Sequence, residues 1–409
     1  MSVTVKPTMC SLAYHDFWPS CLHAEEGFMN ARFERFDILV PRANNWLRQN
    51  PRAEVTKCQT LEKRVTSPEQ LMQNSLQSEL PKFHNNVYFV KGLRLWYYII
   101  SPSYTNPHPP VQIGYRNFLP RCVDMPPDDW PEFENLTELY IKINNELDTH
   151  PIEGSILTVE TLALHVDADQ LSDLATLQVD QCQWPDSTET SVLYVTRIFY
   201  CFQCPAYEQV GAADFFPDHQ IAAPSPNFVF SSFSTIIAKV NCWLTKVKDI
   251  RITNIQTLET VYDPSDSEEK LETSTNFLPP EAGSPLIRFI RVMYVRPKYG
   301  MPPGGLHTPS AIWFKNFVPL TLLHEGKGST QKLDPCHETL SAIWDRVKDW
   351  QKKDNKNVLD VEMLYYPLSI LQQEHEDIET TVLPNLSHHM LIEVLRYCVC
   401  IKMTLINDL

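Results

Sequence analysis

Three short phrases recur four times along the chain, in the same order and at nearly constant spacing. The first joins aromatic residues to a proline, and its phenylalanines lie 101, 97 and 102 residues apart: Phe17, Phe118, Phe215 and Phe317. A chain of this kind folds as similar units that bury their apolar faces against one another. The sequence therefore predicts four internal repeats of about 100 residues, bounded at 1–105, 106–205, 206–299 and 300–409.

The other two phrases follow each of these phenylalanines. One begins with glutamine or glutamate and continues with Thr-Leu or Met-Leu, at Gln59, Glu160, Gln256 and Glu362. The other contains an arginine between apolar residues, at Arg94, Arg197, Arg291 and Arg396. In the first three copies a tyrosine follows three residues later, at Tyr97, Tyr200 and Tyr294.

Each copy is predicted to fold as β-α-β-β. The first phrase ends a strand, because proline cannot continue a central ladder. Apolar residues at three- and four-residue spacing then indicate a helix, which in the first copy is expected to begin at or near Pro41. Two strands rich in β-branched and aromatic residues carry the remaining phrases. The fold class is therefore α+β, with mostly antiparallel sheets covered by helices.

The packing of the four copies has two possible solutions. A single β-α-β-β unit exposes one sheet face and two edges, which another copy must cover. Two side-by-side pairs, each sharing a six-stranded sheet, are favoured here, and a closed pseudo-symmetric ring is the alternative. The connection 263–276, between the last two strands of the third copy, is polar and acidic and is predicted to be mobile.

The charge of the chain argues against two classes of partner. Its 50 acidic and 35 basic residues give a formal charge of −15, which disfavours binding to nucleic acid or to an anionic membrane surface. There is no signal peptide pattern and no apolar run long enough to cross a membrane. Eleven scattered cysteines do not form a disulfide framework. A cytoplasmic location is therefore expected.

The four arginines are the strongest candidate functional residues. Strand alternation places each on the opposite face from its apolar neighbours. The favoured interpretation is a cross-strand pair with the glutamine or glutamate of the second phrase, such as Arg197 with Glu160. The alternative is a groove of guanidinium groups that binds carboxylate or phosphate ligands, joined by Tyr97, Tyr200 and Tyr294.

No motif indicates a metal, a cofactor or a catalytic nucleophile. Cys201 and Cys204 form one C-x-x-C without a second half, and the pairs His388-His389 and His375-Glu376 fall in a loop. The segment 325–330 has the letters of a phosphate-binding loop but lacks its leading glycine. We therefore expect no metal and no cofactor.

Two functions remain in view. A non-enzymatic platform that contacts other proteins is favoured, because duplication multiplies equivalent surfaces. The alternative is a small-molecule binder or enzyme with a pocket between repeats, which should break the pattern in one copy. The fourth copy does so, with Met363 in place of threonine and Val399 in place of tyrosine, but toward less reactive side chains. The second copy differs as well, with Leu147 in place of tryptophan and Glu160 in place of glutamine. RNA binding at the arginine strands is a third, less favoured possibility.

Overall fold

A computed structural model shows how the chain folds. It describes residues 12–23, 32–72, 77–78, 88–99, 110–125, 131–166, 177–185, 191–220, 229–262, 275–277, 286–299, 308–309, 311–322, 336–354, 357–374, 378–383 and 391–401. The class is α+β, as predicted, and every strand pair among these residues is antiparallel. None of the helices in these ranges is both long and apolar enough to cross a membrane.

The described elements fall into four units with the same order: a strand, a short two-stranded ribbon, a helix and two long strands. Unit 1 consists of β1 (Leu12–Phe17), β2 (Cys21–His23), β3 (Arg32–Phe33), α1 (Phe36–Gln49), β4 (Ala53–Val65), η2 (Pro68–Met72), β5 (Gln77–Ser78) and β6 (Tyr88–Ile99). Unit 2 consists of β7 (Ile113–Phe118), β8 (Cys122–Asp124), β9 (Glu132–Phe133), α2 (Leu136–Thr149), β10 (Gly154–Val166), β11 (Gln183–Pro185) and β12 (Ser191–Phe202).

The second half of the chain has the same order. Unit 3 consists of β13 (Glu208–Phe215), β14 (His219–Gln220), β15 (Val229–Phe230), α4 (Phe233–Lys246), β16 (Arg251–Val261), β17 (Asn276–Phe277) and β18 (Leu286–Pro297). Unit 4 consists of β19 (Ala311–Phe317), β20 (Thr321–Leu322), β21 (Cys336–His337), α6 (Leu340–Asp354), β22 (Asn357–Pro367), α7 (Leu368–Glu374), β23 (Val382–Leu383) and β24 (Leu391–Ile401). All four first strands end at the phenylalanine of the first phrase, as predicted.

Each unit forms a sheet with its last long strand in the middle. In unit 1 the order is β1-β6-β4, and the other units repeat it with β7-β12-β10, β13-β18-β16 and β19-β24-β22. The fourth strand of each sheet is two or three residues long and comes from a different unit. These pairs are β11 with β6, β17 with β12, β23 with β18, and β5 with β24.

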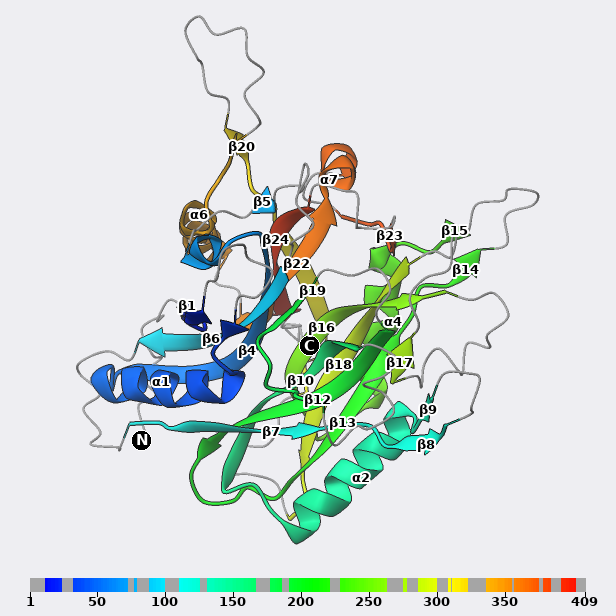
Figure 1. Ribbon diagram of the computed structural model, residues 1–409. Coiled ribbons are helices and arrows are strands. Elements are labelled where there is room, and N and C mark those ends of the chain that lie inside the picture. The colour runs from blue at the N-terminus through cyan, green and yellow to red at the C-terminus, as the bar shows by residue number, and fades with distance from the viewer. Residues whose placement is uncertain are drawn as a thin grey trace, which may run out of the picture.

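These short strands close the units into a ring. Each of units 2, 3 and 4 sends its strand back to the preceding unit, and unit 1 sends β5 to unit 4. The favoured arrangement of two pairs sharing six-stranded sheets is therefore wrong, because no sheet of the described residues has more than four strands. Figure 1 shows the helices at the periphery and β4, β10, β16 and β22 toward the middle.

Each of the four long helices, α1, α2, α4 and α6, packs between the sheet of its own unit and that of the next unit. The core around α1 includes Leu93 of β6 together with Ile113 and Phe199 of unit 2. The cores around α2 and α4 likewise include Met293 of unit 3 and Phe314 of unit 4, respectively. The core around α6 completes the ring, because it contains Leu12 and Trp96 of unit 1. Burial of apolar area therefore joins all four units in a circle.

Two sequence expectations need correction or qualification. The first helix begins at Phe36, five residues before Pro41, which lies inside it. The buried face formed by Phe36, Leu39, Val40, Ala43 and Leu47 outweighs the one backbone hydrogen bond that proline removes. The predicted mobile connection 263–276 lies mostly outside the described residues, but Asn276 belongs to β17 and Thr275 is buried.

Candidate functional site

Four polar side chains meet where the first long strand of each unit (β4, β10, β16 or β22) approaches the middle of the ring. Each strand has a register irregularity of the β-bulge type just before one of them, and a bulge re-aims the residue that follows. We call these residues the axial set: Lys57, Thr158, Asn254 and Asp360. All four are buried, although no two share the same side-chain chemistry.

The axial set links each unit to the unit before it. In every case the side chain bonds a main-chain group one residue after the neighbouring member of the set. The bonds are Cys58 N–H to Thr158 Oγ1, Asn254 Nδ2 to Val159 O, Ile255 N–H to Asp360 Oδ2, and Lys57 Nζ to Val361 O. The last bond joins unit 1 to unit 4, so the cycle is closed.

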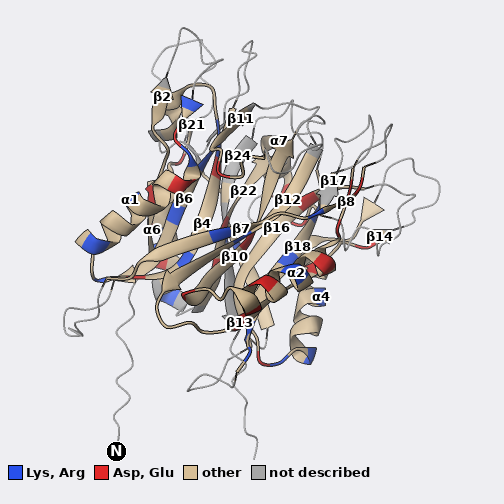
Figure 2. Cartoon of the chain, turned by 60° about the horizontal axis from the view of Figure 1, so that its bottom comes forward, with Lys and Arg blue, Asp and Glu red and all other residues tan. Residues whose placement is uncertain are grey.

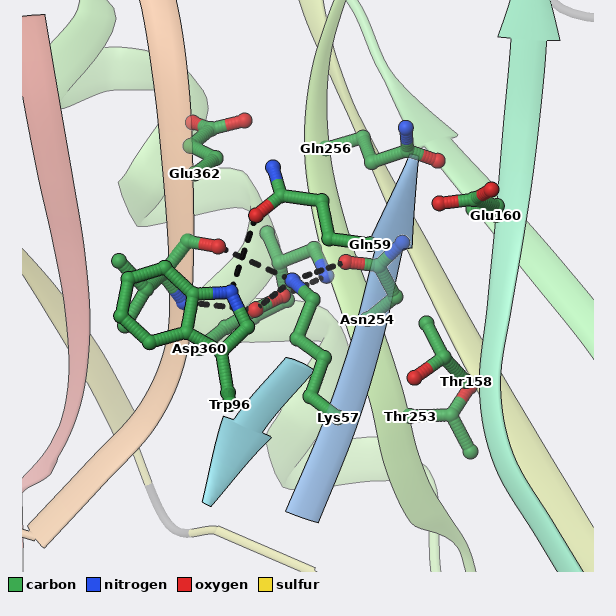
Figure 3. Close-up of polar contacts among 12 residues, drawn as sticks. Lys57, Gln59, Trp96, Thr158, Glu160, Thr253, Asn254, Gln256, Asp360 and Glu362 are labelled. Atoms are coloured by element: carbon green, nitrogen blue, oxygen red, sulfur yellow. Dashed lines mark hydrogen bonds and ion pairs between the residues drawn. The ribbon is translucent and has the colours of Figure 1, made fainter. Parts of the chain in front are cut away.

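Lys57 and Asp360 form a buried ion pair at this closing point (Figure 3). Lys57 Nζ also donates to Asn254 Oδ1 at 2.7 Å and to Val361 O at 3.1 Å, so all three ammonium protons have acceptors. Burial raises the pKa of Asp360, while the nearby Lys57 ammonium opposes that shift. These hydrogen bonds compensate the two charges for the water that they lose on burial.

A second layer is formed by the glutamine and glutamate residues of the second phrase. Three of them form hydrogen bonds with a threonine of the preceding unit. That threonine directly follows the preceding unit's own glutamine or glutamate. Glu160 accepts from the N–H and hydroxyl of Thr60, and Glu362 accepts from the same groups of Thr257. Gln256 exchanges hydrogen bonds with the backbone of Thr161. Burial raises the pKa of both glutamates, and the arginine opposite each one limits the rise.

The four predicted arginines lie directly behind this layer. Each is opposite its own glutamine or glutamate in the strand register, as the favoured interpretation expected. All four are at most 1% exposed. Each Nη1 donates to the preceding unit: Arg197 to Thr60, Arg291 to Thr161, Arg396 to Thr257, and Arg94 to the sulfur of Met363. Figure 2 shows blue bands within the sheets as well as on the outer helices.

The remaining donors of these arginines are held within the protein. Arg94 and Arg291 make forked pairs with Asp16 and Asp214, with every N–O distance between 2.6 and 2.7 Å. The corresponding groups in the other two units are uncharged amides: Asn117 accepts from Arg197 Nε and Asn316 from Arg396 Nε, both at 2.7 Å. These bonds hold the arginines inside the ring, and Arg94 also lines the cavity described below.

The predicted tyrosines are not brought together with the arginines. Tyr97 and Tyr294 contact Trp46 and Trp243 of their own helices, with ring centroids 5.1 and 5.7 Å apart. Tyr200 lies over Gly114 of the adjacent strand, where a Cβ atom would come within 2.6 Å of its ring. A separation of three residues puts tyrosine and arginine on opposite faces of a strand. The expected convergence is therefore absent.

The junction of units 4 and 1 departs from the other three. Its threonine position is Met363, so Gln59 Oε1 accepts from Trp96 Nε1 at 3.0 Å instead. The Gln59 amide nitrogen donates to no residue in the described ranges. At the other junctions a helix asparagine bonds both main-chain groups at the start of the next sheet: Asn44 to Ile113, Asn144 to Val210, and Asn241 to Ile312. The corresponding residue of α6 is Lys348, which pairs with Asp345.

A cavity of about 240 Å³ opens at this junction. Most of its lining comes from units 1 and 4, and the rest comes from the axial strands of units 2 and 3. Lining residues include Asp16, Trp18, Lys57, Gln59, Glu62, Arg94, Glu160, Gln256, Glu362, Met363 and Tyr365. We call it the axial pocket. Figure 3 shows Glu160 and Glu362 on opposite sides, with Gln59 between them.

A second buried lysine lies in unit 1, outside this lining. Lys91 is 2% exposed, and its Nζ lies 4.4 Å from the ring centroid of Trp184. Burial, followed by the positive charge of Arg197, lowers the pKa of Lys91 to about 8. The thiol of Cys182, whose main-chain carbonyl accepts from Lys91 N–H, has its pKa raised to about 12 by burial.

The structure does not bring the cysteine and histidine residues of the sequence motifs together into a site among the described residues. Cys201 is half-buried and Cys204 is exposed. No group of three or more His, Cys, Asp or Glu side chains suited to a metal occurs in the described ranges. The pairs His388-His389 and His375-Glu376 and the segment 325–330 lie outside the described residues.

Comparison with known proteins adds no relative. No family model matches the chain, and neither a curated protein nor a solved structure shows significant similarity to it. Function must therefore be argued from the axial pocket and the surface alone.

Proposed function

We propose that the chain is a closed ring of four β-α-β-β repeats that binds a small molecule in the axial pocket. The observation that carries this proposal is that the pocket and the break in the repeat pattern lie at the same junction. The pocket lies where Met363 interrupts the otherwise repeated links between threonine and glutamine or glutamate. A repeat that serves only packing has no reason to differ at one junction, whereas a binding site needs one position to differ.

The repeat interpretation is supported by bonds at matching positions. A basic residue of each helix donates to the carbonyl just before the proline of the first phrase. These bonds are Arg42 to Trp18, Lys142 to Leu119, Lys239 to Phe216, and Arg346 to Val318. Four such matches in register favour duplication of one unit over four unrelated segments.

The direct test is capture of a ligand from a metabolite extract by the purified protein, followed by dialysis and mass spectrometry. We expect one compound to be retained by the wild type and lost with Gln59→Ala, which removes a pocket amide. Asn241→Ala is the matched control, since it removes bonds at a junction away from the pocket. Failure of the wild type to retain any compound, or equal retention by Gln59→Ala, would contradict the proposal.

A protein-binding platform is the second candidate, and one surface observation favours it. Leu22 of β2 and Val123 of β8 occupy the same position of their ribbons and are 55% and 60% exposed. Repeated apolar residues on projecting ribbons suit contact with another protein. The cytoplasmic location remains a prediction alongside this candidate.

The platform is best tested at the ribbons. The arginines are unsuitable, because their buried bonds make alanine variants unstable. A Leu22→Ser, Val123→Ser variant should lose a captured protein while keeping the wild-type thermal unfolding. Retention of that protein by the folded variant would refute binding through the ribbons.

A further inference from the structure

The charges in and around the axial pocket nearly cancel. Its wall and the groups directly behind it contain five carboxylates: Asp16, Glu62, Glu160, Asp360 and Glu362. The same region contains five cations, Lys57, Lys63, Arg94, Arg197 and Arg396, and Arg197 also pairs with a sixth carboxylate, Asp180, at 3.0 Å. Arg94 binds Asp16 through two short bonds, and Arg396 Nη1 lies 3.7 Å from Glu362 Oε1. An anion or a cation would enter this pocket without a counter-charge left to bind it.

The polar groups of the wall offer both kinds of hydrogen bond. Each oxygen of Glu362 accepts one bond from Thr257, and a carboxylate oxygen has a second lone pair. Glu160 is bonded in the same way by Thr60. The Gln59 amide nitrogen is a donor without a partner among the described residues. A ligand that both donates and accepts at neighbouring atoms fits this wall.

One aromatic ring is held in the wall by a glycine. The six-membered ring of Trp18 lies against Gly92, where a Cβ atom would come within 2.6 Å of it. In unit 3 the corresponding place is filled by the stacked rings of Phe216 and Phe289, 4.4 Å apart. Only unit 1 thus combines a tryptophan with a glycine here, and its Trp18 lines the pocket. An aromatic face offers apolar contact to the C–H groups of a ligand.

We infer that the axial pocket takes a neutral, hydroxyl-rich molecule of the monosaccharide or polyol class. Hydroxyl groups donate and accept at once, carry no charge and leave C–H faces for an aromatic ring. This inference rests on the proposed small-molecule function and replaces the anionic ligand expected from the arginines.

The experiment is calorimetric titration of the full chain with three sets of probes. The neutral set is glucose, galactose, myo-inositol and glycerol, the anionic set is phosphate and citrate, and the cationic set is arginine and spermidine. We expect binding only from the neutral set, weakened about tenfold by Gln59→Ala, which corresponds to one lost hydrogen bond. Gly92→Ala, which displaces Trp18, should weaken it as well, and Asn241→Ala should leave it unchanged.

The outcomes separate this inference from the proposed function. Binding of an anionic or cationic probe that Gln59→Ala abolishes would overturn the ligand class and keep the pocket. If no neutral probe binds while the extract yields a charged ligand, the ligand class is wrong. If neither the panel nor the extract yields a ligand, both proposals fail. Gln59→Ala decides the matter should Gly92→Ala fail to fold.

Discussion

Thr257 gives the sharpest test of the links between units. Its hydroxyl donates to Glu362 Oε1 at 2.7 Å and accepts from Arg396 Nη1 at 3.1 Å. Both partners are buried and charged, and a hydrogen bond to a charged group contributes about 1.5–3 kcal/mol. Thr257→Val keeps the side-chain shape and removes both bonds. The Thr257 N–H still binds Glu362, so each of the two lost bonds is expected to contribute near the lower end of this range. The free energy of unfolding should therefore fall by about 3 kcal/mol.

The control is Thr253→Val in the same strand. Thr253 is buried, and its hydroxyl donates only to the Met293 carbonyl, at 3.3 Å. This neutral bond should contribute about 1 kcal/mol. Urea unfolding followed by circular dichroism gives both free energies. Equal losses for the two variants, or a loss below 1 kcal/mol for Thr257→Val, would refute the reasoning.

Three further predictions concern titration and the departing junction. Glu362→Gln copies Gln256. Because burial raises the pKa of Glu362, the wild type should lose stability as pH rises above the unfolded glutamate pKa of about 4.3, and the variant should lose less over the same range in urea unfolding. Lys91 has its pKa lowered to about 8, so wild-type stability should rise between pH 8 and its unfolded pKa near 10.4. Lys91→Met should flatten that rise, and an unchanged slope would contradict the assignment. Asn241→Ala should lower stability by about 1–2 kcal/mol, whereas Lys348→Asn, which adds the missing clamp, should raise the melting temperature.

The recurring phrases predicted the local architecture well. Proline ended all four first strands at phenylalanine, and phrase spacing put Arg197 opposite Glu160. Local patterns suffice here, because a strand end and a cross-strand neighbour depend on nearby residues. The same alternation rule, applied to Tyr97, would have separated the tyrosines from the arginines.

The ring and its pocket could not be predicted in the same way. Closure depends on strands of two or three residues, such as β5 and β11, which are too short to show an alternating pattern. The axial set shares a position but not a chemistry, since it contains a lysine, a threonine, an asparagine and an aspartate. In the sequence, each member of the set is a polar residue two positions before the glutamine or glutamate of the second phrase. A search for one residue type at that position does not find it, because the type differs in every unit.

A double-mutant cycle between Lys57 and Asp360 tests ring closure most directly, because these residues are 303 positions apart. Lys57→Met and Asp360→Asn should each cost about 3–5 kcal/mol, since each leaves a buried charge without its partner. The double variant should cost less than the sum, with a coupling energy of at least about 2 kcal/mol in urea unfolding. Additivity within about 0.5 kcal/mol would show that units 1 and 4 do not meet, and would contradict both the ring and its axial pocket.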